Sequence, residues 1–251
     1  MARLGHARRH STFATIISLA AAALLSPVAL MGAWVYAESL PLQVYSTAVG
    51  EIRPITLDRW LSLRLNTGTG ASVTLSDEIS EVGLDHGEAL FEVERESPRQ
   101  LRVVIGDMVM SARAAKFSVR VRDPKNMDLL VSTGQVTVGT TLVGARQMAK
   151  ISPDGMRLRE LNESDVARRL EWTSGHLTFA GETLAEVVAE FNRYNDRKMV
   201  ITDRSIGFIS IGGKFLVGDV QSFVAALRPL GVRATANDES GIRLVGARGA
   251  N

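Results

Sequence analysis

The feature that most constrains the fold is an alternation of helix and strand signals in the last third of the sequence. Thr183 and Glu186 have the spacing of a helix capping box, and an apolar stripe at helical spacing follows them. Asp219 is placed to cap a second helix, which should stop near Pro229 and Gly231. The two stripes consist of Leu184, Val187, Val188 and Phe191, and of Val220, Phe223, Val224 and Leu227.

Strand signals separate these two helices. Residues 198–202 and 208–215 have the composition of strands, and the second alternates around Gly212 and Gly213. From Trp172 to Leu244 the expected order is strand, helix, strand, strand, helix, strand, strand, which is a small α+β module of the βαββαβ type. A module of this size has one core and little room for a buried catalytic pocket, so the pattern favours docking over chemistry.

The front of the chain predicts an exported protein. Arg3, Arg8 and Arg9 lie in a basic tail of 12 residues, and Phe13–Ala37 follows without a charged side chain. As a helix of ~1.5 Å per residue this run would cross a ~30 Å hydrocarbon core, and the preceding arginines would keep the N-terminus in the cytoplasm. The alternative is a signal peptide cleaved near Ala37. Both interpretations place residues 38–251 outside the cytoplasm.

Charge and cysteine content narrow the function classes. The net charge of +2 comes from the basic tail, because the chain from Glu38 onward carries 26 basic and 27 acidic side chains. A nearly neutral body argues against nucleic-acid binding. The chain has no cysteine, so an exported protein of this sequence must depend on packed cores rather than disulfides.

The middle third, residues 42–151, has the pattern of an all-β domain. Short alternating runs separated by turn residues predict a β-sandwich or a flattened β-coil. Gly50, Gly87 and Gly134 each precede such a run and are expected at turns. The expected strands are 51–57, 61–65, 88–93, 101–105, 116–121, 128–132 and 135–138. Residues 152–171, which begin with a strong turn at Ser152–Gly155, are expected to be a linker, and 172–246 the α+β module.

The sequence contains no recognisable catalytic, cofactor or metal motif. It has no nucleophile elbow, no His-Glu-x-x-His pattern and no cysteine nucleophile. Residues 207–214 differ from a phosphate-binding loop, since Gly213 stands where the lysine is required. His86 and His176 are far apart in the sequence and have no cysteine partner. We therefore expect no enzyme activity, no cofactor and no metal.

Several motifs resemble those of the FecR family of bacterial inner-membrane regulators. In the β part the resemblance rests on residues 47–51 (TAVGE), 87–93 (GEALFEV), 117–119 (FSV) and 134–138 (GQVTV). In the last third it rests on residues 172–179 (WTSGHLTF) and 191–195 (FNRYN). The resemblance implies that residues 172–246 have the fold of the short N-terminal domain of secretins and TonB-dependent receptors.

The resemblance also implies a function. Members of the family are single-pass signal transducers whose periplasmic part reads the signalling domain of a TonB-dependent outer-membrane receptor, often a siderophore receptor in iron transport. Their cytoplasmic part is an anti-sigma domain that binds an extracytoplasmic-function (ECF) sigma factor. Here 12 residues precede the apolar run, so regulation of a sigma factor is expected directly or through a partner, with the usual sigma-binding domain missing. The alternative is an envelope structural or secretion-assembly module without a regulatory role.

The candidate partner-binding residues lie in the last third of the chain. The glycine pair in the 208–215 strand would let another backbone approach, which favours partner binding by strand addition. The competing interpretation is an ordinary inner strand with a bulge. Amphipathic side chains beside it add to the expected docking surface. The candidates are Arg193, Tyr194, Phe208, Ser210, Gly212, Gly213 and Lys214.

Overall fold

The computed structural model describes residues 41–235 and 241–247, and residues 42–251 form one compact unit. The expected membrane segment or signal peptide, Phe13–Ala37, lies outside the described residues. Within the described part, no helix has the length and apolar character needed to cross a membrane.

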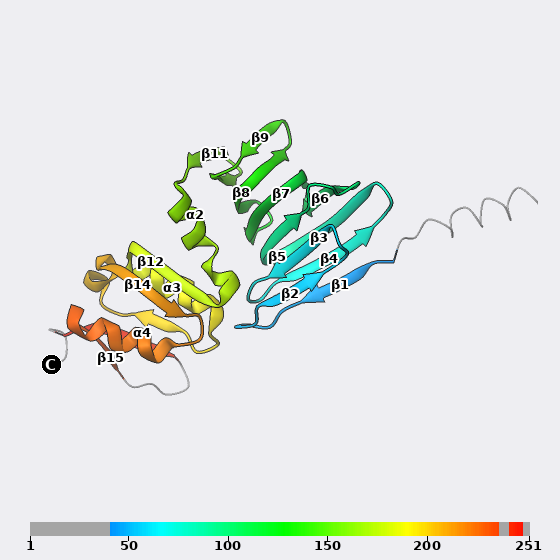
Figure 1. The fold of residues 1–251 in the computed structure, drawn as a ribbon. Coiled ribbons are helices and arrows are strands. Elements are labelled where there is room, and N and C mark those ends of the chain that lie inside the picture. Colours follow the sequence, from blue (N-terminus) through cyan, green and yellow to red (C-terminus); the bar gives the residue numbers. More distant parts are fainter. Residues whose placement is uncertain (1–40, 236–240, 248–251) are drawn as a thin grey trace, which may run out of the picture. The chain divides into compact units, whose positions relative to one another are not determined.

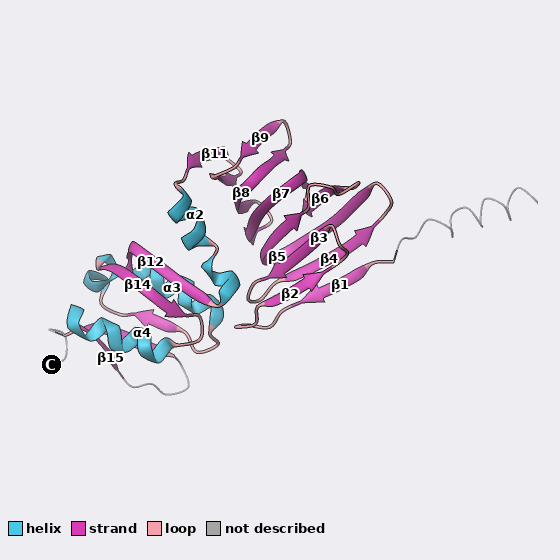
Figure 2. Ribbon diagram, viewed as in Figure 1, coloured by secondary structure: helices cyan, strands magenta, loops and turns pink. Residues whose placement is uncertain are grey.

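Residues 43–160 form the β region, an antiparallel-rich sheet without a helix (Figure 1 and Figure 2). The described sheet has 11 strands in the order β1-β4-β5-β6-β7-β8-β10-β11, with β3 and then β2 paired beside β5 and with β9 beside β8. The strands are β1 (Gln43–Ser46), β2 (Arg53–Thr56), β3 (Leu61–Leu65), β4 (Gly70–Leu75), β5 (Ile79–Val93), β6 (Gln100–Ile105), β7 (Met108–Asp123), β8 (Asn126–Val138), β9 (Thr141–Gly144), β10 (Gln147–Ser152) and β11 (Gly155–Glu160).

Three of these strands are much longer than expected. The expectation of short strands separated by glycine turns is wrong for β5, β7 and β8. Strand β5 continues through Gly87, β7 continues through Ala114, which has a positive φ of 50°, and β8 continues through Gly134. Gly87 and Gly134 have φ of 89° and 77°, and a Cβ there would lie 2.3 Å from Thr69 Oγ1 and from Ala114 O respectively. These glycines bend continuous strands instead of ending them, because a residue without a Cβ tolerates both the positive φ and the close approach.

The bends let one sheet enclose one core. The first half of β5 pairs with β4 and β6, and its second half pairs with β3 and β7. Alternate residues on the strands are buried in a single apolar cluster that includes the stacked rings of Phe91 and Phe117. The expectation of an all-β region is confirmed.

Residues 152–171, expected as a linker, contain regular structure. The turn at Ser152–Gly155 is present, but it joins β10 to β11, which pair over their full length. Helix α2 (Glu163–Arg169) follows, capped by the side chain of Asn162, and a 3₁₀ turn η1 (Glu171–Ser174) leads into the last third. The division into separately folding domains stays a prediction.

Residues 172–246 form the C-terminal module, and its element order is the expected one. The capping box of Thr183 and Glu186 is present at the start of α3, and Asp219 caps α4. Strands β12 and β14 form one sheet, while β13, β16 and β15 form another. The elements are β12 (His176–Thr183), α3 (Leu184–Tyr194), β13 (Met199–Ile201), η2 (Arg204–Phe208), β14 (Ser210–Leu216), α4 (Val220–Leu227), η3 (Arg228–Leu230), β15 (Val232–Thr235) and β16 (Ile242–Gly246).

The core of the module is built around α3. Its stripe residues are all buried, and Phe191 stacks on Phe223 with ring centroids 4.3 Å apart and meets Phe215 edge-on at 5.8 Å. Leu90 of β5 belongs to this same apolar cluster, and Ile52 packs against it. The C-terminal module and the β region are therefore in direct apolar contact.

Phe191→Ala should lower the free energy of unfolding by ~3–5 kcal/mol, because it removes a fully buried ring and leaves a cavity among other rings. Chemical denaturation of the full chain measures the change. Phe208→Ala is the matched control, since that ring is 82% exposed and should lose little. A loss below about 1 kcal/mol at Phe191 would contradict the observed packing.

Candidate functional site

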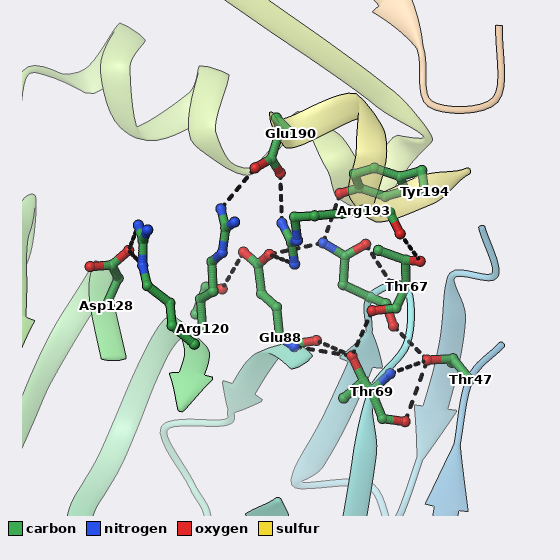
Figure 3. A network of polar contacts seen from close by, with 12 residues as sticks. Thr47, Thr67, Thr69, Glu88, Arg120, Asp128, Glu190, Arg193 and Tyr194 are labelled. Carbon is green, nitrogen blue, oxygen red and sulfur yellow. Dashed lines mark hydrogen bonds and ion pairs between the residues drawn. The ribbon is translucent and has the colours of Figure 1, made fainter. Parts of the chain in front are cut away.

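The residues that combine charge, burial and contact between distant segments meet where α3 packs on the β region (Figure 3). Buried polar or charged residues are few in the described part of the chain, and all but Ser80 gather here. We call this cluster the junction. It consists of Thr47, Asn66, Thr67, Thr69, Glu88, Ser118, Arg120, Glu190, Arg193 and Tyr194.

Helix α3 supplies three of the junction side chains from one face. Glu190, Arg193 and Tyr194 are three and four residues apart, so they lie along one side of the helix, and Tyr194 is itself buried beside the apolar stripe. The guanidinium of Arg193 bonds Glu88 Oε2 at 2.8 Å and Glu190 Oε1 at 2.6 Å. Arg120 of β7 reaches the other oxygen of Glu190 at 2.9 Å. Two carboxylates and two guanidiniums thus alternate across the contact.

Hydrogen bonds from the uncharged side chains of Asn66 and Thr67 surround these ion pairs. The amide of Asn66 donates to Glu88 Oε2 at 2.9 Å and to the Tyr194 hydroxyl at 2.8 Å. The hydroxyl of Thr67 donates to the backbone carbonyl of Arg193 at 3.0 Å and accepts from the Gly50 N–H at 2.8 Å. Because buried polar groups must be paired, each of these bonds favours one relative position of the two segments.

The burial and the opposite charges set the ionisation of the junction. Burial alone would raise the pKa of Glu190, but Arg193 and Arg120 outweigh it and hold that pKa below its usual value. Burial would lower the pKa of Arg193, and Glu88 and Glu190 raise it instead. Burial and the neighbouring Glu88 raise the pKa of Tyr194. At neutral pH Glu190 and Arg193 are therefore charged and the Tyr194 phenol is neutral.

The structure separates the predicted partner-binding residues into two groups. Arg193 and Tyr194 are enclosed in the junction, where they contact the β region of the same chain. Ser210, Gly212, Gly213 and Lys214 are exposed along β14, and Phe208 just before it is 82% exposed. Lys214 also forms an ion pair with Glu171 at 2.9 Å.

Strand β14 is an edge strand in the described structure. It pairs with β12 alone, with Gly213 opposite Phe179 and Gly212 opposite Ala180. The bulge of this sheet falls on β12, between Ala180 and Glu182. The backbone of β14 therefore presents one row of hydrogen-bonding groups without a strand partner among the described residues.

The sequence did not single out the other junction residues. Glu88, Asn66, Arg120 and Glu190 were missed, because their role depends on a contact between segments far apart in the chain. One local signal existed: Glu88 is a carboxylate at the start of an apolar run directly after the strand-bending Gly87. Among the described residues, no group of three or more His, Asp or Glu side chains could hold a metal ion.

Comparison with known proteins defines the class of the β region. Residues 43–137 match the family model described as FecR protein. The chain therefore carries a FecR-family domain over these residues. The search of curated proteins found no matching relative.

Solved structures extend the likeness beyond the β region. Two crystal structures of a putative anti-sigma factor from Parabacteroides distasonis, at 1.65 Å and 2.50 Å resolution, are similar to this chain with TM-scores of 0.65 and 0.64. They cover 81% and 82% of this chain and 99% of their own chains, at 20% and 21% sequence identity. The part of this chain that is covered is longer than the β region, so the similarity of fold includes the C-terminal module.

Arg193→Met should lower the free energy of unfolding by ~3–5 kcal/mol, because it leaves Glu88 and Glu190 buried without their shared partner. Chemical denaturation of the full chain gives the change. Arg233→Met, at an exposed position on β15, is the matched control and should stay within about 0.5 kcal/mol of the parent. Equal losses for the two variants would show that the junction adds nothing specific.

Proposed function

We propose that this chain is a regulatory signal transducer of the cell envelope. Its C-terminal module binds the periplasmic signalling domain of a TonB-dependent receptor, of the siderophore type, and the chain regulates an ECF sigma factor directly or through a partner. The FecR-family domain at residues 43–137 supports the regulatory class, and so does the fold shared with proteins described as anti-sigma factors.

The single observation that carries the binding proposal is the open edge of β14. A partner strand can pair with its free backbone while an apolar side chain of the partner covers the exposed ring of Phe208. Leu216 at the other end of the strand is 54% exposed and extends the apolar surface. Arg193 and Tyr194 act indirectly in this proposal, because they attach the module to the β region.

The proposed location is the bacterial inner membrane, with Phe13–Ala37 as a retained single span and the remainder in the periplasm. A reporter enzyme that is active only in the periplasm should be active when fused after Asn251, and the chain should stay with membranes through a high-salt wash. A soluble chain beginning at Glu38 would support cleavage instead.

Phe208→Ser should weaken binding of the full chain to the signalling domain of the receptor encoded beside its gene. We expect a loss of about tenfold, equivalent to ~1.4 kcal/mol, because the ring would anchor an apolar contact. Calorimetric titration measures the affinity, which should depend little on salt since the body of the chain is nearly neutral.

Leu142→Ser is the matched control, since this side chain is 52% exposed on β9 of the β region. It should leave the affinity unchanged, and both variants should keep the melting temperature of the parent. Absence of binding into the high micromolar range would refute the receptor proposal. An affinity that the Phe208→Ser substitution leaves unchanged would show that the contact does not lie at β14.

A further inference from the structure

A second open edge lies at the far end of the β region. Strand β11 is the last strand of the described sheet and pairs with β10 alone. On the core side of β11, Met156 packs against the apolar cluster, while Leu158 is 47% exposed at its rim. An additional strand would find both unpaired backbone groups and an apolar rim to cover.

The opposite face of the sheet carries a row of charges that crosses five strands. The cross-strand register places Glu88 opposite Arg120, Arg120 opposite Asp128, Asp128 opposite Lys150, and Lys150 opposite Arg157. Directly opposite residues lie on the same face, and unlike charges there are favourable while like charges are unfavourable. The row alternates in sign from β5 to β10 and then breaks, since Lys150 and Arg157 are both cations.

The cations at this break have no carboxylate at ion-pair distance among the described residues. Asp128 accepts from Arg122 at 2.6 Å and 3.2 Å, and no ion pair in the described part of the chain includes Lys150, Arg157 or Arg159. Arg169 of α2 has a buried Nε without a hydrogen-bond partner among the described residues. Burial, which is the largest cause, and the cations Arg168 and Arg159 lower the pKa of Arg169, while Asp165 and Glu182 oppose this shift.

We propose that β11 is a docking edge for an extended acidic segment of a partner protein. The segment pairs with the β11 backbone and places carboxylates opposite Arg157 and Arg159, which supplies the opposite charge that is missing at the break in the row. Acidic residues at every second position face these cations, and the residues between them are apolar and cover Leu158. This site is separate from β14 and does not depend on the receptor proposal.

The register argues against a second copy of this chain as the occupant. When two β11 strands pair antiparallel about Leu158, a register that keeps the apolar sides on one face, Arg157 of each copy lies opposite Arg159 of the other. That arrangement adds repulsion where an acidic strand removes it. Cations on an edge also discourage accidental pairing, so the occupant must supply the opposite charge.

The test uses the full chain and a fluorescent peptide matched in length to β11, in which glutamate alternates with valine. Fluorescence anisotropy should show saturable binding that weakens as salt is raised. The double variant Arg157→Glu/Arg159→Glu should lose about tenfold or more in affinity. Arg53→Glu is the matched control, because Arg53 is an exposed cation on the edge strand β2, and it should bind as the parent does.

Two altered peptides separate strand addition from simple charge attraction. A peptide of the same composition with its glutamates grouped together, and one with a central valine replaced by proline, should each bind about tenfold more weakly or worse. Equal binding of all three peptides, equal binding by the double variant, or no saturable binding into the high micromolar range would overturn the proposal. Light scattering provides a further check. If the parent chain forms a dimer and the double variant does not, the proposal is overturned and the occupant of the β11 edge is a second copy of this chain.

Discussion

The structure depends on one charged contact, the guanidinium of Arg193 held between Glu88 and Glu190. These groups are largely removed from water, so they are stable only when each finds its partner. The contact of Leu90 with the module core buries apolar surface, but apolar burial does not specify how the two parts are oriented. The ion pairs and the hydrogen bonds of Asn66 specify the orientation of α3 on the β region, because a small displacement of α3 would leave charges buried without partners. The junction thus fixes how the C-terminal module attaches to the FecR-family domain.

The strand bends have a consequence for interaction as well as for folding. Gly87 and Gly134 let long strands turn and enclose one core, and the sheet that these strands form ends at β11; β14 is an edge of the separate sheet that it forms with β12. The edge at β11 carries the exposed cations Arg157 and Arg159, which form no ion pair in the described part of the chain, and the edge at β14 lies beside the exposed ring of Phe208. The two proposals therefore assign different chemistry to the two edges: an acidic strand with salt-dependent binding at β11, and a contact dominated by apolar area at β14.

The fold shared with the structures described as a putative anti-sigma factor includes both parts of the chain, although the family match covers residues 43–137. The motif residues of the two parts meet at the junction: Glu88 follows Gly87 in one, and Arg193 and Tyr194 lie in the other. A partner bound to the C-terminal module would act on the β region through this contact, because α3 carries both the module core and the junction side chains.

The sequence alone determined the order of helices and strands in the C-terminal module, since these signals are local. The capping box at Thr183, the cap at Asp219 and the two apolar stripes specify helices through neighbours within one or two turns. The all-β character of residues 43–137 was equally local, because strand alternation needs no distant partner. Strand lengths were not predictable, since a glycine that bends a strand and one that ends it look alike until the pairing is known. The enclosure of Arg193 and Tyr194 and the row from Glu88 to Arg157 were decided by tertiary structure, because each joins residues whose proximity exists only after the chain has folded.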